Sequence, residues 1–287
     1  TSEWAKKAYV PLSRSLVAME ESDLAEQWLR HVVEDHRAIG PESDFFRDAL
    51  IELGGLYYRR GSQDDVFYAR AIEVLGDEGG AVERYAMQRD EQKRREDPAL
   101  GPRLRYMLAD CLRLSAQGLG RQAAQAPNPA DRLEMQAERV RRLQDAQILY
   151  HQVVTEMSEI HLDSLSRIER VYLRNAYFYM ADCAYARSDY ANAILLYQDA
   201  ATRWQDHPSS LVAWVQIVNA AAEMGDFERA RAAHRQAVDV FNKLPEEVFD
   251  HPDSLMTRQR WDDWLRWSTE LDLYPDGTAT AGVETGS

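Results

Sequence analysis

The chain has little glycine, proline or cysteine, and this scarcity narrows the fold class. Its 287 residues include 14 glycines, 10 prolines and 2 cysteines. No segment sustains the period-two alternation of β-branched residues that marks half-buried strands. Alanine, leucine, glutamate, glutamine and arginine are plentiful, and all five are good helix formers. The composition therefore predicts an all-α protein.

The sequence also lacks an excess of positive charge, because its formal net charge is −14. A nucleic-acid binder needs a cation-rich surface to displace the counterions of the phosphates. Two arginine-rich stretches, 84–95 and 132–142, are interleaved with acidic residues. They indicate solvated helix faces with ion pairs four residues apart. We expect no nucleic-acid partner, and the acidity favours a basic protein partner.

Long apolar runs are missing as well. No run is long enough to cross a bilayer, and the first residues do not resemble a secretion signal. We expect no direct insertion into a membrane. The chain opens at Thr1 without a methionine, which indicates a processed form or a piece of a longer protein. Cytoplasm and periplasm both stay open as compartments.

Motifs for chemistry are missing too. No G-x-S-x-G, phosphate-binding loop or dinucleotide glycine pattern occurs. His31 and His36 flank two carboxylates, but their spacing puts the rings about 140° apart on a helix, so they cannot share a metal. Asp-His-Pro occurs at 206–208 and 250–252, where histidine complements the helix dipole and proline stops the helix. We expect no enzyme activity, no metal and no cofactor.

What the sequence does contain is an internal repeat. Two stretches superimpose when one is moved 37 residues along the other. Tyr177, Ala181, Ala184, Asp189, Tyr190, Ala193, Ala200, Trp204 and Pro208 fall on Trp214, Val218, Ala221, Asp226, Phe227, Ala230, Ala237, Phe241 and Pro245. A unit of this length cannot bury its own apolar face, so copies must stack. The repeat predicts a helical array that binds other molecules.

These residues resemble the tetratricopeptide repeat family. In that family a bulky residue near the start of a first helix is followed by small residues at fixed offsets on both helices and by a closing proline. Weaker copies cover 41–76 and 103–157. In the second of these, the markers of the second helix, Ala146 and Tyr150, come late, which predicts an insertion of about 25 residues. The resemblance implies a right-handed superhelix of four to five antiparallel helix pairs.

The helical period of the apolar residues, together with glycines and prolines at the breaks between helices, predicts where the helices lie. The expected ranges are 4–20, 23–37, 43–60, 63–75, 103–116, 131–157, 164–187, 190–206, 209–224, 227–243 and 254–271. Residues 1–97 should hold divergent helix pairs and a charged connector at 81–96. Residues 98–274 should form the main array, with an inserted loop near 118–131 and a capping helix at 254–272. We expect 275–287 to be a disordered tail.

The last expected helix carries Trp261, Trp264 and Trp267 and resembles the cap that ends such arrays. An uncapped end would expose the apolar face of the last repeat. The alternative is an aromatic patch that binds a partner, because tryptophan is enriched at interface hot spots.

The two cysteines, Cys111 and Cys183, each close an Ala-Asp-Cys tripeptide, and they lie 72 residues apart. Stacked helices are about 8–10 Å apart, so two repeats separate these positions by on the order of 20 Å. A disulfide needs Cα atoms within about 7 Å. We expect two free, buried thiols.

In arrays of the resembled family, side chains of the first helices line the concave face. Transferred to this sequence, that geometry marks positions suited to an extended or helical peptide. The positions are Ile51, Tyr58, Arg59, Tyr106, Asp110, Arg113, Asn175, Phe178, Asp182, Tyr185, Val215, Asn219 and Glu223. Some members grip a terminal carboxylate with lysine and asparagine, but the matching positions here are Gly55, Asp110, Asp182 and Asn219. The two aspartates would repel a carboxylate, so a basic or amide-rich ligand is expected.

Together these features predict a non-catalytic scaffold or adaptor that binds a protein or peptide along its concave face. One alternative is a structural subunit of a larger assembly. The other is a sensory array that regulates a catalytic or DNA-binding domain outside this chain.

Overall fold

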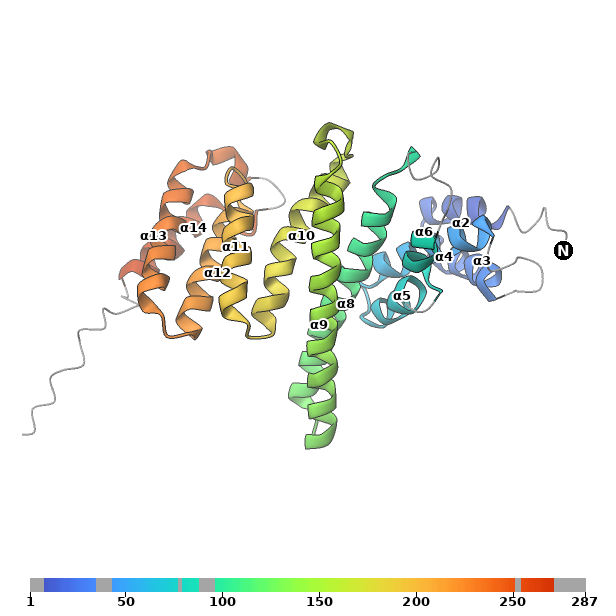
Figure 1. Cartoon of the computed structure of the whole chain (residues 1–287), viewed down its shortest axis with the longest axis horizontal. Coiled ribbons are helices and arrows are strands. Elements are labelled where there is room, and N and C mark those ends of the chain that lie inside the picture. The colour runs from blue at the N-terminus through green and yellow to red at the C-terminus, as the bar shows by residue number, and fades with distance from the viewer. Residues whose placement is uncertain (1–7, 35–42, 77–78, 88–95, 251–253, 271–287) are drawn as a thin grey trace, which may run out of the picture. The chain divides into compact units, whose positions relative to one another are not determined.

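The computed structural model describes residues 8–34, 43–76, 79–87, 96–250 and 254–270, and every regular element within these ranges is a helix (Figure 1). The first half contains α2 (Tyr9–Ala18), α3 (Ser22–Glu34), α4 (Asp44–Arg60), α5 (Val66–Gly76), α6 (Ala81–Met87), α8 (Leu100–Gln125) and α9 (Pro129–Ser158). The second contains η1 (Leu162–Ser164), α10 (Arg167–Ala186), α11 (Tyr190–Arg203), α12 (Ser209–Glu223), α13 (Phe227–Lys243), η2 (Glu246–Phe249) and α14 (Arg258–Glu270). The all-α fold class is confirmed.

The helices pack in chain order. Among the described residues, α2/α3, α4/α5, α8/α9, α10/α11 and α12/α13 form five consecutive pairs, and α14 follows them. The first helices α2, α4 and α8 also contact one another in turn. Such a succession of neighbour contacts defines a helical solenoid. The contacts divide the chain into two compact units, 1–176 and 177–287, so the expected boundary at 97/98 lies inside the first unit.

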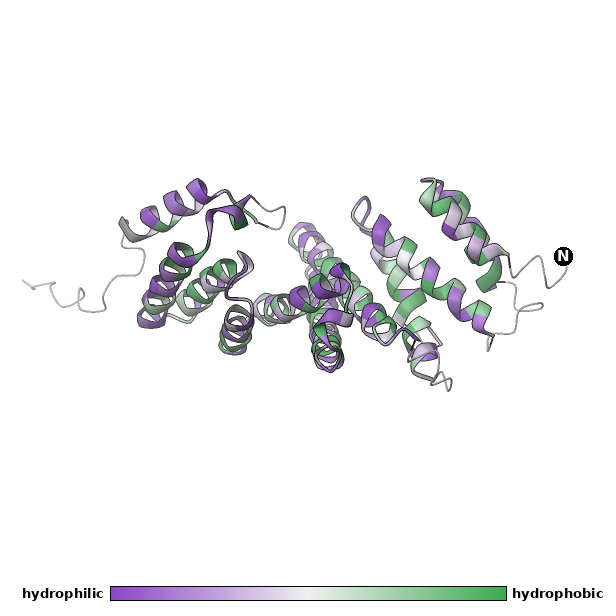
Figure 2. Ribbon diagram, turned by 90° about the horizontal axis from the view of Figure 1, so that it is seen from above, coloured by the Kyte–Doolittle hydropathy of each residue, from purple (hydrophilic) through white to green (hydrophobic). Residues whose placement is uncertain are grey.

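Alanines allow the helices of the second unit to pack closely. The small residues of both repeats have no exposed surface, and apolar and polar residues are interspersed along each helix, as expected for helices that bury one side (Figure 2). The fully buried alanines are Ala181, Ala184, Ala193, Ala200, Ala221, Ala230 and Ala237. The spacing of small residues in the sequence therefore corresponds to helix–helix contact in the structure.

The predicted inserted loop near 118–131 is wrong. The insertion lengthens α8 and α9 into one long hairpin, and only 126–128 connect them. Gly118 and Gly120 lie inside α8, where a Cβ on Gly118 would come within 3.0 Å of the Asp65 carboxylate and one on Gly120 within 3.3 Å of Arg139 Nε. Both glycines let neighbouring side chains approach α8 closely, and neither glycine ends the helix. The far end of the hairpin projects beyond α4 and α5 (Figure 1).

The start of α9 also differs from its prediction. Asn128 is the N-cap, and its side chain accepts a hydrogen bond from the Ala130 N–H, with proline at the first helical position. Asp131, the first residue of the predicted helix, accepts a hydrogen bond from Asn128 Nδ2 at 3.1 Å. Proline at this position favours the earlier start because its fixed φ suits the first turn.

The charged connector expected at 81–96 is in part a packed helix. α6 contacts α4, α5 and α8, and Ala81 is fully buried. The Arg84 guanidinium lies over the Phe46 ring, 4.9 Å from its centroid. Residues 88–95 and the expected tail lie outside the described residues. Part of the charged segment therefore packs as a short helix against its neighbours.

α14 packs against α13 at the end of the second unit. Trp261 and Leu265 are 3% and 4% exposed and share an apolar cluster with Phe241 and Phe249. Trp267 is 55% exposed. α14 therefore covers the apolar side of α13 and leaves one of its tryptophans at the surface.

Cys111 and Cys183 are both free and buried, as expected. Burial raises the pKa of the Cys111 thiol, and the neighbouring Asp110 charge adds to the effect. Both cysteines pack as small apolar side chains.

Candidate functional site

Three of the expected binding residues of the first unit form a buried polar cluster. Tyr58 Oη donates to Asp110 Oδ2 at 2.9 Å, and Tyr150 Oη donates to Asp110 Oδ1 at 2.9 Å. Arg113 Nε lies 3.1 Å from Asp110 Oδ1 and 3.2 Å from Tyr150 Oη. The cluster joins α4, α8 and α9, and we call these four residues the Asp110 cluster.

The electrostatics of the Asp110 cluster are those of a core ion pair. Asp110 is 5% exposed and Arg113 is 9% exposed. Burial, followed by the Asp110 charge, raises the pKa of Tyr58, so this phenol stays protonated and donates. Burial by itself would lower the pKa of Arg113, but Tyr150 and Asp110 outweigh it and raise that pKa. The charges satisfy each other and fasten three helices, which leaves them little surface for a partner.

A second group of expected residues connects α8 to α10. Tyr106 is 2% exposed, and its ring stacks on Tyr172 at 4.2 Å between centroids. Asn175 Nδ2 donates to Tyr106 Oη at 3.5 Å. Arg59, by contrast, is exposed on α4. Most of the expected residues in the first unit thus take part in helix packing, and their contact with a partner stays a prediction.

In the second unit the expected residues lie nearer the surface. Phe178 is buried, but Glu223 is exposed and Tyr185 and Asn219 are half-buried. Burial raises the pKa of Tyr185 of α10, and the charge of Glu223 of α12 adds to the effect. The Tyr185 ring contacts Tyr190 at 5.2 Å between centroids.

Two more of the expected residues, Asn219 and Asp182, form hydrogen bonds with neighbouring side chains of the second unit. Asn219 Nδ2 donates to Gln216 Oε1 at 3.0 Å on α12. Asp182 is half-buried and accepts a hydrogen bond from Tyr197 Oη of α11. We call Asp182, Tyr185, Asn219 and Glu223 the acidic first-helix patch.

The sequence reasoning missed a hydrogen bond that recurs in the two units. Asp110 accepts from Tyr150, 40 residues later, and Asp182 accepts from Tyr197, 15 residues later. Each aspartate belongs to an Ala-Asp-Cys tripeptide, and each tyrosine follows a buried alanine by four residues. The repeated tripeptide and the tyrosine were both visible in the sequence, but no local pattern shows that the aspartate and the tyrosine bond to each other.

Within the described ranges, no group of three or more His, Cys, Asp or Glu side chains could hold a metal ion. No helix of the described parts is both long and apolar enough to span a bilayer. His31 lies against the Tyr9 ring at 5.7 Å between centroids, and His36 is outside the described residues.

Comparisons with known proteins add little beyond helical character. No family model and no curated protein matches the chain. The crystal structure of BtubC (BKLC) from P. vanneervenii has 13% identity, a TM-score of 0.40, and coverage of 96% of this chain and 85% of that one. A Rap protein complexed with Competence and Sporulation Factor has 14% identity, a TM-score of 0.31, and coverage of 92% and 87%. At such scores neither likeness assigns a function.

Proposed function

We propose that this chain is a non-catalytic interaction scaffold that binds a protein or peptide segment on the acidic first-helix patch. The observation that carries the proposal is an exposed carboxylate, Glu223, and two half-buried polar side chains, Tyr185 and Asn219, on the first helices α10 and α12. A carboxylate beside an aromatic ring and an amide suits a basic or amide-rich segment. Solenoids present such faces because each repeat contacts only its neighbours.

We also propose that the repeats are of the tetratricopeptide type. The fully buried alanines at the offsets of that family support this assignment, as does the recurrence of the aspartate–tyrosine bond between paired helices. Small residues at these positions let paired helices approach closely, which is the physical basis of the family pattern.

A charge reversal on α12 tests the binding face. The probes are twelve-residue peptides of basic, neutral and acidic composition, and binding is measured by fluorescence anisotropy at two salt concentrations. Wild type should bind the basic peptide more tightly than the neutral one, and Glu223→Lys should weaken the basic peptide about tenfold, because it replaces attraction with repulsion.

Glu228→Lys, on an exposed position of α13, is the matched control and should leave the basic peptides bound. If wild type shows no preference for basic peptides, or if both variants weaken binding equally, the acidic first-helix patch is not the binding face.

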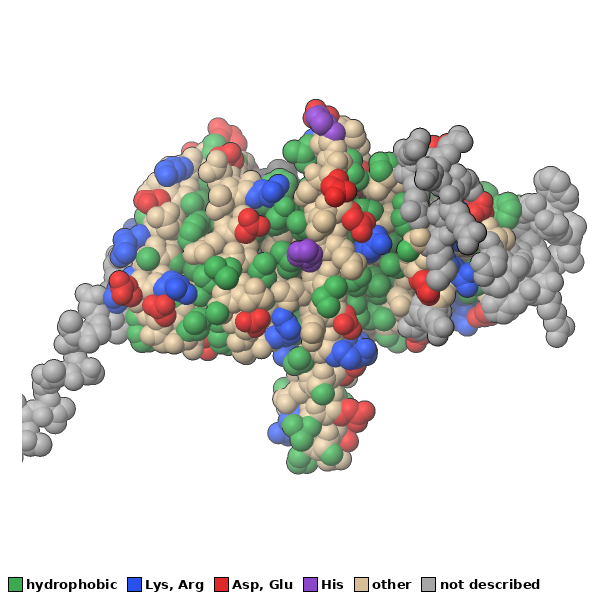
Figure 3. All heavy atoms as spheres, viewed as in Figure 1, with side chains coloured by type: hydrophobic (Ala, Val, Ile, Leu, Met, Phe, Trp, Pro, Cys, Tyr) green, Lys and Arg blue, Asp and Glu red, His purple; other side chains and the backbone are tan. Residues whose placement is uncertain are grey.

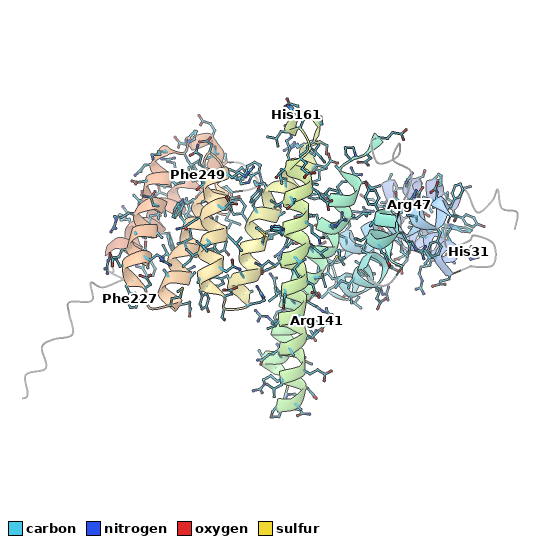
Figure 4. The ribbon with its side chains drawn as sticks, in the orientation of Figure 1. His31, Arg47, Arg141, His161, Phe227 and Phe249 are labelled. Atoms are coloured by element: carbon cyan, nitrogen blue, oxygen red, sulfur yellow. The ribbon has the colours of Figure 1, made fainter. Side chains whose placement is uncertain are left out.

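A second candidate function is a subunit of a larger assembly, and one observation favours it. The projecting α8/α9 hairpin exposes Leu133 by 68% and Val140 by 43%, beside charged side chains of both signs (Figure 3). Arg141 lies on this part of α9 (Figure 4). Affinity enrichment from the native host, followed by a size measurement, separates the two functions. A large stable complex that dissociates in the Leu133→Glu variant would support the role as a subunit of a larger assembly.

A further inference from the structure

The second unit contains a groove outside the acidic first-helix patch. It lies over α12, between α11 and α13, and has a volume of about 350 Å³. The lining residues are Gln198 of α11, Trp214 and Ile217 of α12, and Arg229, Ala232, Ala233, Arg235 and Gln236 of α13. We call this feature the α11–α13 groove. Phe227, the first residue of α13, marks the helix end nearest to Arg229 (Figure 4).

The floor of the α11–α13 groove is apolar. Ile217 is fully buried, Ala233 is 4% exposed, and Trp214 is half-buried. Alanine at 232 and 233 keeps the α13 wall low, so part of the indole of Trp214 stays accessible. A floor of this kind takes an aliphatic side chain, because burying apolar surface is favourable by roughly 25 cal/mol per Å².

The walls of the groove are polar, and their charged side chains are all positive. Gln198 and Gln236 supply amides, while Arg229 and Arg235 are the charged residues of the lining. Arg229 is partly engaged by Asp226, 3.5 Å away across one helical turn. Arg235 is exposed and forms no ion pair within the described part of the chain. In a chain with net charge −14, a lining with two arginines and no carboxylate is an unusual local excess of positive charge.

We propose that the α11–α13 groove binds an acidic peptide segment of a protein partner, with a glutamate or aspartate next to an aliphatic side chain. The aliphatic side chain packs on Trp214 and Ile217. The carboxylate lies against the Arg235 guanidinium, whose planar fork matches two carboxylate oxygens. Amides of Gln198 and Gln236 are placed to bond the peptide backbone.

This site is independent of the acidic first-helix patch. Trp214 and Asn219 both lie on α12, but five residues of helix separate their directions by about 140°. The groove faces α11 and α13, and its charge is opposite to that of the patch. Failure of basic peptides to bind would therefore leave this proposal standing, and the reverse also holds.

The test uses the full chain and two capped hexapeptides with a neutral fluorophore: Glu-Glu-Leu-Leu-Glu-Glu and its glutamine analogue. Anisotropy should rank the glutamate peptide above its glutamine analogue, with binding that weakens as salt rises. Arg235→Glu should weaken it about tenfold and Arg235→Gln about threefold, because an exposed ion pair contributes modestly. Arg260→Glu is the matched control, since Arg260 is also exposed and unpaired within the described residues.

A second readout locates the peptide. With ¹⁵N-labelled tryptophan, the indole resonance assigned through Trp214→Phe should shift on addition of the glutamate peptide, and that of buried Trp261 should not. The proposal is overturned if the glutamate and glutamine peptides bind equally, if Arg260→Glu weakens binding as much as Arg235→Glu, or if the Trp214 resonance does not move. It is also overturned if the glutamate peptide has no measurable affinity for wild type.

Discussion

Removing the Asp110 carboxylate is the sharpest test of how the first unit is held together. Asp110 accepts hydrogen bonds from two tyrosines, and it pairs with Arg113 while only 5% exposed. Asp110→Ala leaves the guanidinium without its carboxylate and both phenols without their acceptor. Because one partner stays charged and buried, the loss exceeds that of an ordinary hydrogen bond.

The structure sets the expected size of the effect. Breaking a buried ion pair from one side costs about 3–5 kcal/mol of unfolding free energy. The exposed pair between Arg121 and Asp65 is the matched control, since its nitrogen and oxygen are 2.6 Å apart and its side chains are 62% and 50% exposed. An exposed pair contributes at most about 1 kcal/mol. Asp110→Ala should therefore cost at least about 2 kcal/mol more than Asp65→Ala.

Urea unfolding followed by circular dichroism measures the difference, with tryptophan fluorescence as a second probe because solenoids can unfold in parts. Hydrogen exchange should show faster opening of α8 and α9 in Asp110→Ala than in wild type. Tyr58→Phe, which removes one donor and keeps the ion pair, should cost about 1 kcal/mol. Equal losses for Asp110→Ala and Asp65→Ala would refute the view that the Asp110 cluster fastens these helices.

Three further predictions concern packing and protonation. Gly54→Ala should lower the unfolding free energy by about 1–3 kcal/mol, because the new Cβ would lie 2.4 Å from the buried side chain of Leu75. The control Gly55→Ala meets only a flexible arginine at 3.5 Å, so it should be neutral or stabilising in thermal unfolding. Burial lowers the pKa of His234, so below about pH 6.5 the unfolded chain binds more protons than the folded chain. As the pH is lowered, the melting temperature should therefore fall more in wild type than in His234→Gln. Burial raises the pKa of Cys111, so a thiol reagent at about pH 8 should find both cysteines unreactive until urea is added, and rapid labelling of native protein would contradict this.

Several features of the fold could be predicted from the sequence alone. The helix over Phe227–Lys243 has its predicted bounds, and α12 ends one residue before its predicted end. These elements combine local signals that agree: good helix formers, a glycine or aspartate at the turn, and small residues at regular offsets. Where such signals conflicted, as at Gly118 and Gly120, the prediction ended the helix too early.

The sequence by itself determined the all-α class, the stacking of helix pairs and the burial of both thiols, because repeated spacing and composition act through contacts between neighbouring segments. Only the tertiary structure decided that the insertion forms a helical hairpin, since glycine within α8 is accommodated by side chains distant in sequence. It also decided that Asp110 faces inward and Glu223 faces solvent, although both occupy first helices. Burial of a polar side chain depends on its partners across helices, here Tyr58 and Tyr150, and no local pattern contains them.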